Sequence, residues 1–331
     1  MADYINIKGS TIQYLDSDPA NPVVGQVWYN STTQTLKGAS AGGATAGTWS
    51  SGGNLNTARQ QTTGCGIQTA GLCVGGEGAP PGGLDTAGAF SEEYDGSSWT
   101  EGNDLNTKSA FATALGLQTA ALVVGGYNPS STLATNQSYN GTSYTEDADI
   151  NSARSSLASS GIQTSGLVFG GGGSPPAGAL TEEFDGSSWT ESGDLNTGRR
   201  ILAGAGTQTA SLAFGGALDP GTSQSVTEQY NGTTWTEVAD LNTARQALAG
   251  GGIQTDALAF AGHSPNVTNT ESWNGTSWTE VAELATGRRE LGGFGATGSL
   301  DLACGGNSGS VTNATEEFTA PNIVTKTFDV S

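Results

Sequence analysis

An aromatic residue flanked by Ser or Thr recurs six times along this chain of 331 residues, at intervals of 43 to 50 residues. The six aromatic residues are Trp49, Trp99, Tyr144, Trp189, Trp235 and Trp278. Each is followed by a variant of Asp-Leu-Asn-Thr-Ala-Arg, a Gly/Ala-rich stretch, Ile-Gln-Thr, an apolar run and a pair of small residues such as Gly75-Gly76. Self-similarity at this period predicts a repeat architecture in which neighbouring units bury a shared core.

Within one unit, four short runs have the composition of β-strands, at residues 60–67, 70–74, 90–94 and 98–101. The last two meet at Asp95-Gly96, and Asn-Gly or Asp-Gly supplies the positive φ angles of a type I′ hairpin turn. The 52 glycines do not recur every third residue, which excludes collagen, and they argue against a helical bundle because glycine destabilises helices. The sequence therefore predicts an all-β fold, a six-bladed β-propeller with four-stranded blades.

The two ends of the repeat region complement each other. Phe318 is a sixth third-strand aromatic residue, yet five residues later the chain has Ile323 and no Trp motif. Trp49 belongs to a fourth strand that no third strand precedes. We therefore expect the N-terminal strand at Trp49 to complete the last blade and to close the ring without a free sheet edge. The predicted organisation is a hairpin segment over residues 1–40, the propeller over 41–320 and a tail over 321–331.

The repeat resembles that of the kelch family over residues 47–320. Its units carry a diglycine that closes the second strand, Tyr or Phe on the third strand and Trp on the fourth. These aromatic residues are Tyr94, Tyr139, Phe184 and Tyr230, and Trp99, Trp189 and Trp235. The resemblance implies the propeller fold. Copper-radical oxidases built on kelch propellers need two histidines, whereas this chain has only His263, so we expect neither a metal nor another cofactor.

One face of the predicted propeller carries loops that differ from unit to unit, and such loops commonly hold binding specificity. Eight of the 11 Lys and Arg residues lie where the chain enters an inner strand on this face. Five units have Arg at one position and Glu two residues before the third-strand aromatic, and the second unit lacks both. We therefore favour ion pairs within blades over a ring of ligand-facing arginines. The predicted pairs are Arg59 with Glu92, Arg154 with Glu182, Arg199 with Glu228, Arg245 with Glu271, and Arg288 with Glu316.

Three cations outside this register, Lys108, Arg200 and Arg289, are the candidate ligand-binding residues, together with Tyr127 and His263 of the variable loops. Basic side chains at this mouth would suit an acidic peptide, a glycan carboxylate or a phosphate. The sequence predicts no catalytic residue.

Residues 1–40 lie outside the repeat. A stretch punctuated by Pro19 and Pro22 leads into a predicted hairpin of residues 26–30 with 35–37. Its Trp-Tyr-Asn and Leu-Lys sequences resemble a short hairpin in tail and fibre proteins of tailed bacteriophages. The resemblance implies a virion protein, assembled in the host cytoplasm, that joins other virion proteins through residues 1–40.

Charge and composition narrow the expected partners. The formal net charge of −20 repels phosphate backbones and anionic lipids, so we expect no nucleic-acid partner and no membrane insertion. No apolar stretch approaches a bilayer-spanning length, and the start lacks the layout of a signal peptide. Cys65, Cys73 and Cys304 have no metal-ligand spacing, and either a Cys65–Cys73 disulfide or free buried thiols are compatible with the sequence.

These observations favour a non-enzymatic phage virion protein whose propeller binds a host surface glycan or a protein partner through its variable face. Two alternatives stay open: a purely structural virion component packing on neighbouring subunits, and a glycan-active enzyme. The sequence also leaves a homo-oligomer open.

Overall fold

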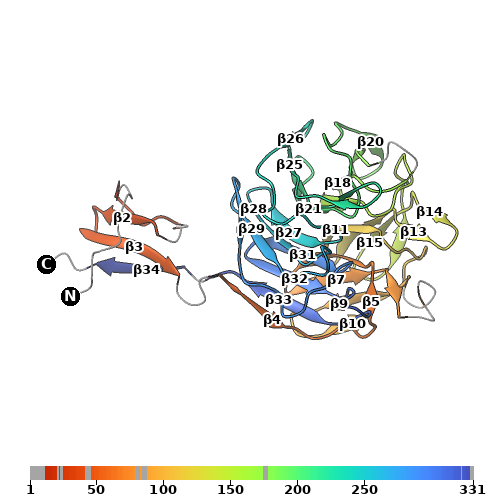
Figure 1. Cartoon of the computed structure of the whole chain (residues 1–331), viewed down its shortest axis with the longest axis horizontal. Coiled ribbons are helices and arrows are strands. Elements are labelled where there is room, and N and C mark those ends of the chain that lie inside the picture. Colours follow the sequence, from red (N-terminus) through yellow and green to blue (C-terminus); the bar gives the residue numbers. More distant parts are fainter. Residues whose placement is uncertain are drawn as a thin grey trace. The chain divides into compact units, whose positions relative to one another are not determined.

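The computed structural model describes residues 12–20, 22, 25–41, 46–79, 83, 88–173, 178–321 and 323–328. The chain divides into two compact units (Figure 1). Unit 1 comprises Met1–Thr48 and Ala320–Ser331, and unit 2 comprises Trp49–Thr319. Within the described residues, no helix has the length and apolar character needed to cross a bilayer.

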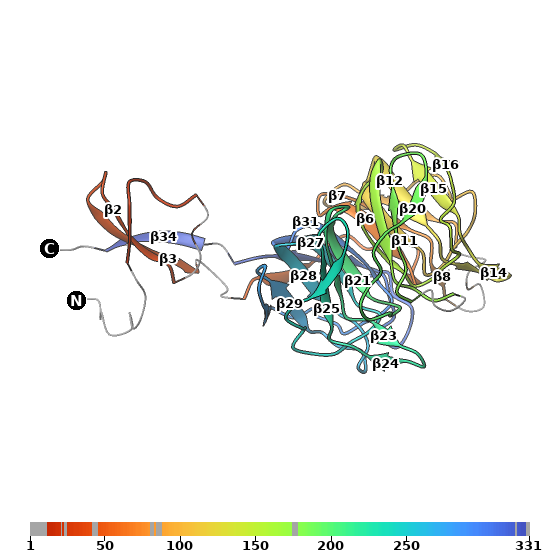
Figure 2. The same ribbon diagram turned by 90° about the horizontal axis from the view of Figure 1, so that it is seen from above.

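Unit 2 has an all-β, propeller-like fold whose described residues form six four-stranded sheets (Figures 1 and 2). Sheet 1 contains β6 (Thr63–Ile67), β7 (Ala70–Val74), β9 (Ser91–Tyr94) and β10 (Trp99–Glu101). Sheet 2 contains β11 (Thr113–Leu117), β12 (Ala120–Val124), β15 (Asn136–Tyr139) and β16 (Tyr144–Glu146). Sheet 3 contains β17 (Ala158–Ile162), β18 (Ser165–Phe169), β19 (Thr181–Phe184) and β20 (Trp189–Glu191).

The remaining three sheets repeat this order, with one exception at the end. Sheet 4 contains β21 (Ala203–Thr207), β22 (Ala210–Phe214), β25 (Thr227–Tyr230) and β26 (Trp235–Glu237). Sheet 5 contains β27 (Ala249–Ile253), β28 (Asp256–Phe260), β29 (Thr270–Trp273) and β30 (Trp278–Glu280). Sheet 6 contains β31 (Gly292–Thr297), β32 (Leu300–Cys304) and β33 (Thr315–Thr319), and its fourth strand is β4 (Thr48–Ser51) from the other end of the repeat region.

The chain turns sharply just before the first strand of each sheet. The predicted strand 60–67 is divided into β5 (Arg59–Gln60) and β6, because Gln61 has a φ of 55°. β5 pairs with β8 (Glu77–Gly78) in a two-stranded sheet beside sheet 1. Similar small sheets are formed by β13 (Tyr127–Asn128) with β14 (Ser131–Thr132) and by β23 (Ala217–Leu218) with β24 (Thr222–Ser223).

Five of the six repeated aromatic residues are hydrogen-bonded to the preceding sheet, and the exception is Trp189, whose buried Nε1 has no partner among the described residues. Trp235 of sheet 4 donates its indole N–H to Thr181 Oγ1 of sheet 3 at 3.0 Å. The same bond, at 2.9 or 3.0 Å, links Trp99 to Thr315, Trp278 to Thr227 and Trp49 to Thr270. In sheet 2 the Oη atom of Tyr144 lies 2.9 Å from Ser91 Oγ. Trp49 is therefore bonded to sheet 5 as Trp99, Trp235 and Trp278 are bonded to their own preceding sheets.

The glutamine of the Ile-Gln-Thr turn is a second link between sheets. Gln163 Nε2 donates to the carbonyls of Ala121 and Tyr139 in the preceding sheet, at 3.1 and 2.8 Å. Gln68, Gln118, Gln208 and Gln254 make equivalent pairs of bonds. The hairpin of sheet 6 has no such glutamine. The first strands of the six sheets contact one another in sequence order, and β31 also contacts β6.

Unit 1 is built around a sheet with the strand order β1 (Gln13–Leu15), β2 (Val27–Asn30), β3 (Thr35–Ala41) and β34 (Ile323–Phe328). The β2–β3 hairpin covers the predicted hairpin, and the fully buried Trp28 donates to Asp18 Oδ1 at 3.0 Å. β34 pairs with β3, so residues that were expected to form a tail belong to the same sheet as the N-terminal hairpin. The division of the chain falls after Thr48 and Thr319 rather than at residues 40 and 320.

Candidate ligand-binding site

The arginines that recur in five units are buried in ion pairs within their own sheets. Arg154 Nη2 lies 2.7 Å from Glu182 Oε1, and both side chains are fully buried. The other four pairs, at 2.8 to 3.3 Å, are Arg59–Glu92, Arg199–Glu228, Arg245–Glu271 and Arg288–Glu316. Each predicted pair is thus present. Five of the eight cations assigned to the variable face are therefore buried in ion pairs and cannot contact a ligand.

Each pair also holds the loop that enters its own sheet. Glu182 Oε2 accepts the backbone N–H and the side-chain amide of Asn151, at 2.7 and 2.8 Å. Arg154 Nη1 donates to the carbonyls of Gly170 and Leu180, at 3.1 and 2.7 Å. Burial lowers the pKa of Arg154, and the negative charge of Glu182 opposes this decrease. The pKa of Arg199 falls to about 10 for the same reason, with Glu228 opposing the effect.

Sheet 2 replaces both members of the pair by neutral residues. Ser109 and Gln137 occupy the two positions, and both are buried. The Gln137 amide accepts the Thr107 N–H at 3.1 Å and donates to the Thr107 carbonyl at 3.0 Å. Removing one charge alone would leave the other buried without a partner, which is costly. This explains why the two exceptions fall in the same sheet.

The residue two positions after each paired arginine, and two positions after Ser109 in sheet 2, has a left-handed backbone conformation. The six residues, which we call the mouth ring, have φ values between 48° and 60° and are Gln61, Phe111, Ser156, Ile201, Ala247 and Glu290. Left-handed conformation favours Gly and Asn, and for a β-branched residue such as Ile201 it is a true outlier. Such strain costs roughly 1–3 kcal/mol per residue and persists only where the surroundings enforce it.

The mouth ring is held by a cycle of backbone hydrogen bonds. Phe111 N–H donates to the Gln61 carbonyl at 2.9 Å, and Ser156 N–H donates to the Phe111 carbonyl at 2.8 Å. The pattern continues through Ile201, Ala247 and Glu290, and Gln61 N–H donates to the Glu290 carbonyl at 2.7 Å. The backbone conformation is therefore imposed by the neighbouring sheets rather than by the side chain at each position.

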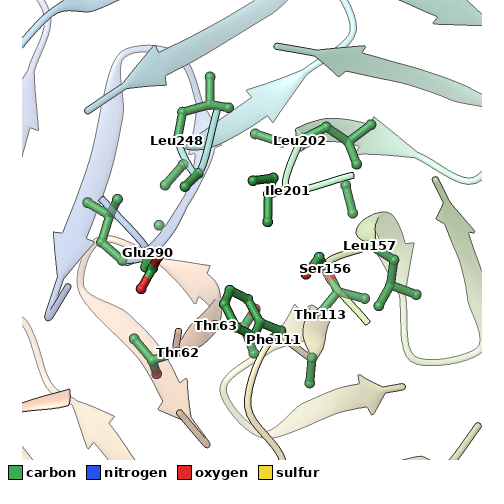
Figure 3. A pocket seen from close by; sticks show the side chains of 18 of the residues that line it. Thr62, Thr63, Phe111, Thr113, Ser156, Leu157, Ile201, Leu202, Leu248 and Glu290 are labelled. Carbon is green, nitrogen blue, oxygen red and sulfur yellow. The ribbon is translucent and has the colours of Figure 1, made fainter. Parts of the chain in front are cut away.

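A cavity of about 130 Å³ opens at the mouth ring. All six mouth-ring residues line it, together with the residues that follow them at the start of each first strand. Figure 3 shows Phe111, Ser156, Ile201 and Glu290 around one open centre, with Leu157, Leu202 and Leu248 beside them. Among the described residues that line this cavity, Glu290 is the single ionisable side chain.

The candidate ligand-binding residues lie next to the mouth ring, and two of the cations are paired. Arg200 Nε lies 3.0 Å from Asp219 Oδ1. Arg289 Nε lies 3.4 Å from Glu290 Oε1, and its Nη1 lies 3.2 Å from His263 Nδ1. Lys108 is half-buried at the entry to sheet 2, and Tyr127, paired with Ala110, is 40% exposed. The acidic partners of Arg200 and Arg289 do not support the expectation of a basic mouth.

A buried carboxyl group marks the junction of sheets 5 and 6. Asp301 is fully buried, and neither of its side-chain oxygens has a hydrogen-bond partner. Burial and the nearby charge of Asp256 raise the pKa of Asp301 well above its usual range. The equivalent positions, opposite the third-strand aromatic, are Gly71, Ala121, Gly166, Ser211 and Ala257. This junction also lacks the turn glutamine.

The cysteines are free and buried. Cys65 lies opposite Leu72, and Cys73 lies opposite Gly64, so the two sulfurs are on opposite faces of sheet 1 and cannot form the disulfide that the sequence left open. In the described part of the chain, no three His, Cys, Asp or Glu side chains are grouped as a metal site would require.

Comparison with known proteins supports the fold alone. No protein-family model matches the chain, and no curated protein matches it. The chain is similar to a solved structure described as the structure of YjhT, with a TM-score of 0.67 and 14% identity. The match covers 82% of this chain and 99% of that one. Both chains therefore share a propeller-like architecture.

The mouth ring was not predicted from the sequence. Its residues include no Gly or Asn that would signal left-handed backbone, and each is of a different type. The sequence did carry one signal for the mouth ring. The residue two positions after the recurrent Arg is different in each of the six units, although Arg itself is present in five of them.

Proposed function

We propose that unit 2 is a six-bladed propeller of the kelch type, with the strand at Trp49 completing its last blade. Three observations support this reading. Sheet 6 takes β4 as its fourth strand, and Trp49 is bonded to sheet 5 as Trp99, Trp235 and Trp278 are to their preceding sheets. The mouth-ring hydrogen bonds return from Glu290 to Gln61.

We propose that this propeller is a binding module whose site is the mouth of the cavity, and that its ligand is a host surface glycan or protein. The observation that carries the proposal is the mouth ring itself. A backbone held by one repeated set of hydrogen bonds presents six different side chains to one cavity. A repeated scaffold with varied residues at one place is the arrangement expected of a recognition site.

The cavity chemistry favours binding over hydrolysis. Glycoside hydrolysis commonly uses two carboxyl groups on either side of the scissile bond. The described lining offers one, Glu290, whose Oε1 atom already lies 3.4 Å from Arg289. We therefore propose a non-enzymatic role.

We further propose that the protein is part of a tailed-phage virion and joins its neighbours through residues 1–40. The resemblance of the β2–β3 hairpin to phage tail and fibre hairpins supports this role. The structure adds a polar anchor to that hairpin, because Asp18 accepts from Trp28 and Asn30 and pairs with Lys37 at 2.5 Å.

Two measurements test the role. An antibody raised against the recombinant chain should label intact virions in immunogold microscopy. The fluorescently labelled chain should adhere to the cells on which the phage grows, and Ser156→Trp, which fills the mouth, should abolish adherence. Virions that the antibody does not label would contradict the virion assignment. Undiminished adherence of the Ser156→Trp variant would contradict the proposal that the mouth is the binding site.

A second candidate function is supported by the end of unit 2 opposite the mouth. Large aliphatic side chains are exposed at one position in four first strands, namely Ile67, Leu117, Ile162 and Ile253, and Leu300 is exposed nearby. An exposed apolar cluster of this kind is typical of a protein contact. In this alternative, the protein is a structural component that packs on a neighbouring subunit. Leu117→Glu combined with Ile162→Glu would then block incorporation, while Ser156→Trp would leave it intact.

A further inference from the structure

The mouth ring keeps side chains that its backbone conformation disfavours. All six residues are left-handed, yet none is Gly or Asn, and Ile201 is β-branched. The hydrogen-bond cycle uses only backbone atoms, so glycine would serve the ring equally well. The strained residues therefore contribute something other than the fold, and their shared feature is that they line the cavity.

The side chains divide the mouth into a polar and an apolar part. Glu290 and Gln61 are neighbours in the ring, since Gln61 N–H donates to the Glu290 carbonyl. Phe111 and Ile201 lie on either side of Ser156, and Leu157, Leu202 and Leu248 line the cavity beside them. A ligand that fits both parts needs a hydrogen-bonding edge and an apolar face.

Fixed polar groups extend the polar part outside the cavity. Asn307 Nδ2 donates to Gln60 Oε1 at 2.5 Å, and Asn266 Nδ2 donates to the Asn307 carbonyl at 2.9 Å. His263 Nδ1 lies 3.2 Å from Arg289 Nη1. Amide and carboxylate groups held in this way can donate to and accept from adjacent hydroxyl groups.

Charge disfavours an acidic ligand. Five arginines are buried in pairs, and Arg200 and Arg289 lie beside Asp219 and Glu290. The ionisable group in the cavity lining is an acid, and the whole chain carries −20. An anionic group would therefore enter against the local and the overall charge.

Resting on the binding role proposed above, we propose that the mouth ring determines specificity for an uncharged terminal sugar. Its hydroxyl edge lies against Gln61 and Glu290, and its C–H face packs on Phe111 and Ile201. A sugar ring combines these two surfaces, and aromatic side chains provide the matching apolar platform. The cavity of about 130 Å³ is below the roughly 300–1,000 Å³ of sites for drug-sized ligands, which suits one ring unit.

The test uses the full chain on an array of neutral glycans and of glycans that end in carboxylated or phosphorylated sugars. We expect binding to neutral terminal sugars and none to the acidic set. The dissociation constant for the bound glycan is then measured with variants. Phe111→Ala and Ile201→Gly should each weaken binding by about tenfold or more. Glu290→Gln should also weaken it, whereas an acidic ligand would bind this variant more tightly.

Ala261→Gly is the matched control for Ile201→Gly, because Ala261 is also left-handed but lies outside the residues that line the cavity. Both changes relieve the same left-handed strain and should raise the melting temperature, which rules out misfolding as the cause of lost binding. Only Ile201→Gly removes a side chain that lines the cavity, and Ala261→Gly copies the glycine of the other units, so Ala261→Gly should keep the affinity within about twofold. Equal affinities of these two variants, or binding confined to acidic glycans, would overturn the proposal.

Failure of this inference is distinguishable from failure of the binding role. If no glycan binds, and adherence to cells is lost after protease treatment but not after periodate treatment, the ligand is a protein. The sugar proposal then falls while the mouth remains a binding site. If Ser156→Trp adheres as well as the wild type, both proposals fall.

Discussion

At the scale of single residues, buried charges show how the repeat tolerates groups that a core usually excludes. Arg154 and Glu182 are fully buried, and each is hydrogen-bonded by further groups, the loop backbone among them. A buried ion pair adds little net stability compared with apolar residues, but removing one member leaves an uncompensated charge. Sheet 2 shows the neutral solution, with Ser109 and Gln137.

A single substitution in this pair is therefore predicted to lower the free energy of unfolding more than a joint replacement by the neutral residues of sheet 2. Arg154→Ala and Glu182→Ala should each lower the free energy of unfolding by roughly 3–5 kcal/mol, and the double change should cost less than their sum. Arg154→Ser with Glu182→Gln, which copies sheet 2, should be tolerated better than either single change. Urea unfolding of the wild type and the four variants measures this, and strictly additive losses in the alanine variants would contradict the pairing.

Asp301 should make the protein less stable as the pH rises. Its pKa in the folded state is raised well above the ordinary value of 3.8, so its contribution to stability is full below about pH 4 and is lost as the pH rises through the folded-state pKa. One such group gives a slope of at most about 1.4 kcal/mol per pH unit. Asp301→Asn should remove this slope and be more stable than the wild type at neutral pH.

The measurement is urea unfolding from pH 4 to pH 8, with Asp256→Asn as the companion variant. Because the Asp256 charge raises the pKa of Asp301, this companion should reduce the slope without abolishing it. An unchanged profile for Asp301→Asn would show that Asp301 is ionised and compensated in the folded state.

At the scale of elements, β4 differs from every other fourth strand because the chain reaches it first. Trp49 donates to Thr270 Oγ1, and its ring lies 5.1 Å from that of Phe260 and 5.3 Å from that of Phe318. One strand thus contacts sheet 5 while belonging to sheet 6. Its loss would remove an aromatic cluster and expose the edge of β33.

Removal of residues 1–51 is predicted to lower the melting temperature sharply and to promote aggregation. Removal of residues 1–40, which keeps β4 and Trp49, should leave the melting of unit 2 close to that of the full chain. Calorimetry of the two truncated proteins compares these outcomes directly. Identical melting of both would refute the role of β4 as a closing strand.

At the scale of the whole molecule, the two ends of the chain meet in one sheet. β34 pairs with β3, so unit 1 needs residues from both ends, while unit 2 lies between them. A unit formed by both termini can carry an attachment function without interrupting the repeat, which agrees with the proposed division of roles.

Removal of residues 1–40 should therefore separate attachment from folding. We expect the truncated chain to keep a folded unit 2 and any ligand binding, and to be missing from assembled particles. Particle composition after complementation with the truncated gene checks this, with Ser156→Trp as the control that assembles but does not adhere. Normal incorporation of the truncated chain would show that attachment uses another surface.

Much of the candidate site's surroundings could be predicted from the residues. The joint absence of Arg and Glu from one unit identified all five buried pairs, because a lone buried charge is not tolerated. The Asn-Gly and Asp-Gly dipeptides located the hairpin between the third and fourth strands, but the predicted type I′ turn is wrong. Gly96 alone is left-handed, with a φ of 92°, and Asp95 instead accepts the backbone N–H groups of Ser97 and Ser98. The pairing of Arg200 and Arg289 with acidic side chains could not be predicted, because Asp219 and Glu290 approach them only in the folded loops.

The repeat by itself determined the four-stranded sheets and the buried ion pairs, because strand periodicity, turn dipeptides and paired charges are properties of residues close in the sequence or at fixed register. Tertiary structure alone decided the mouth ring and the place of β34. No side chain among Gln61, Phe111, Ser156, Ile201, Ala247 and Glu290 favours left-handed backbone. That conformation is imposed by backbone hydrogen bonds between neighbouring sheets. Five of them join residues 43 to 50 positions apart and the sixth joins Gln61 to Glu290, so the cycle is complete only when all six sheets are in place.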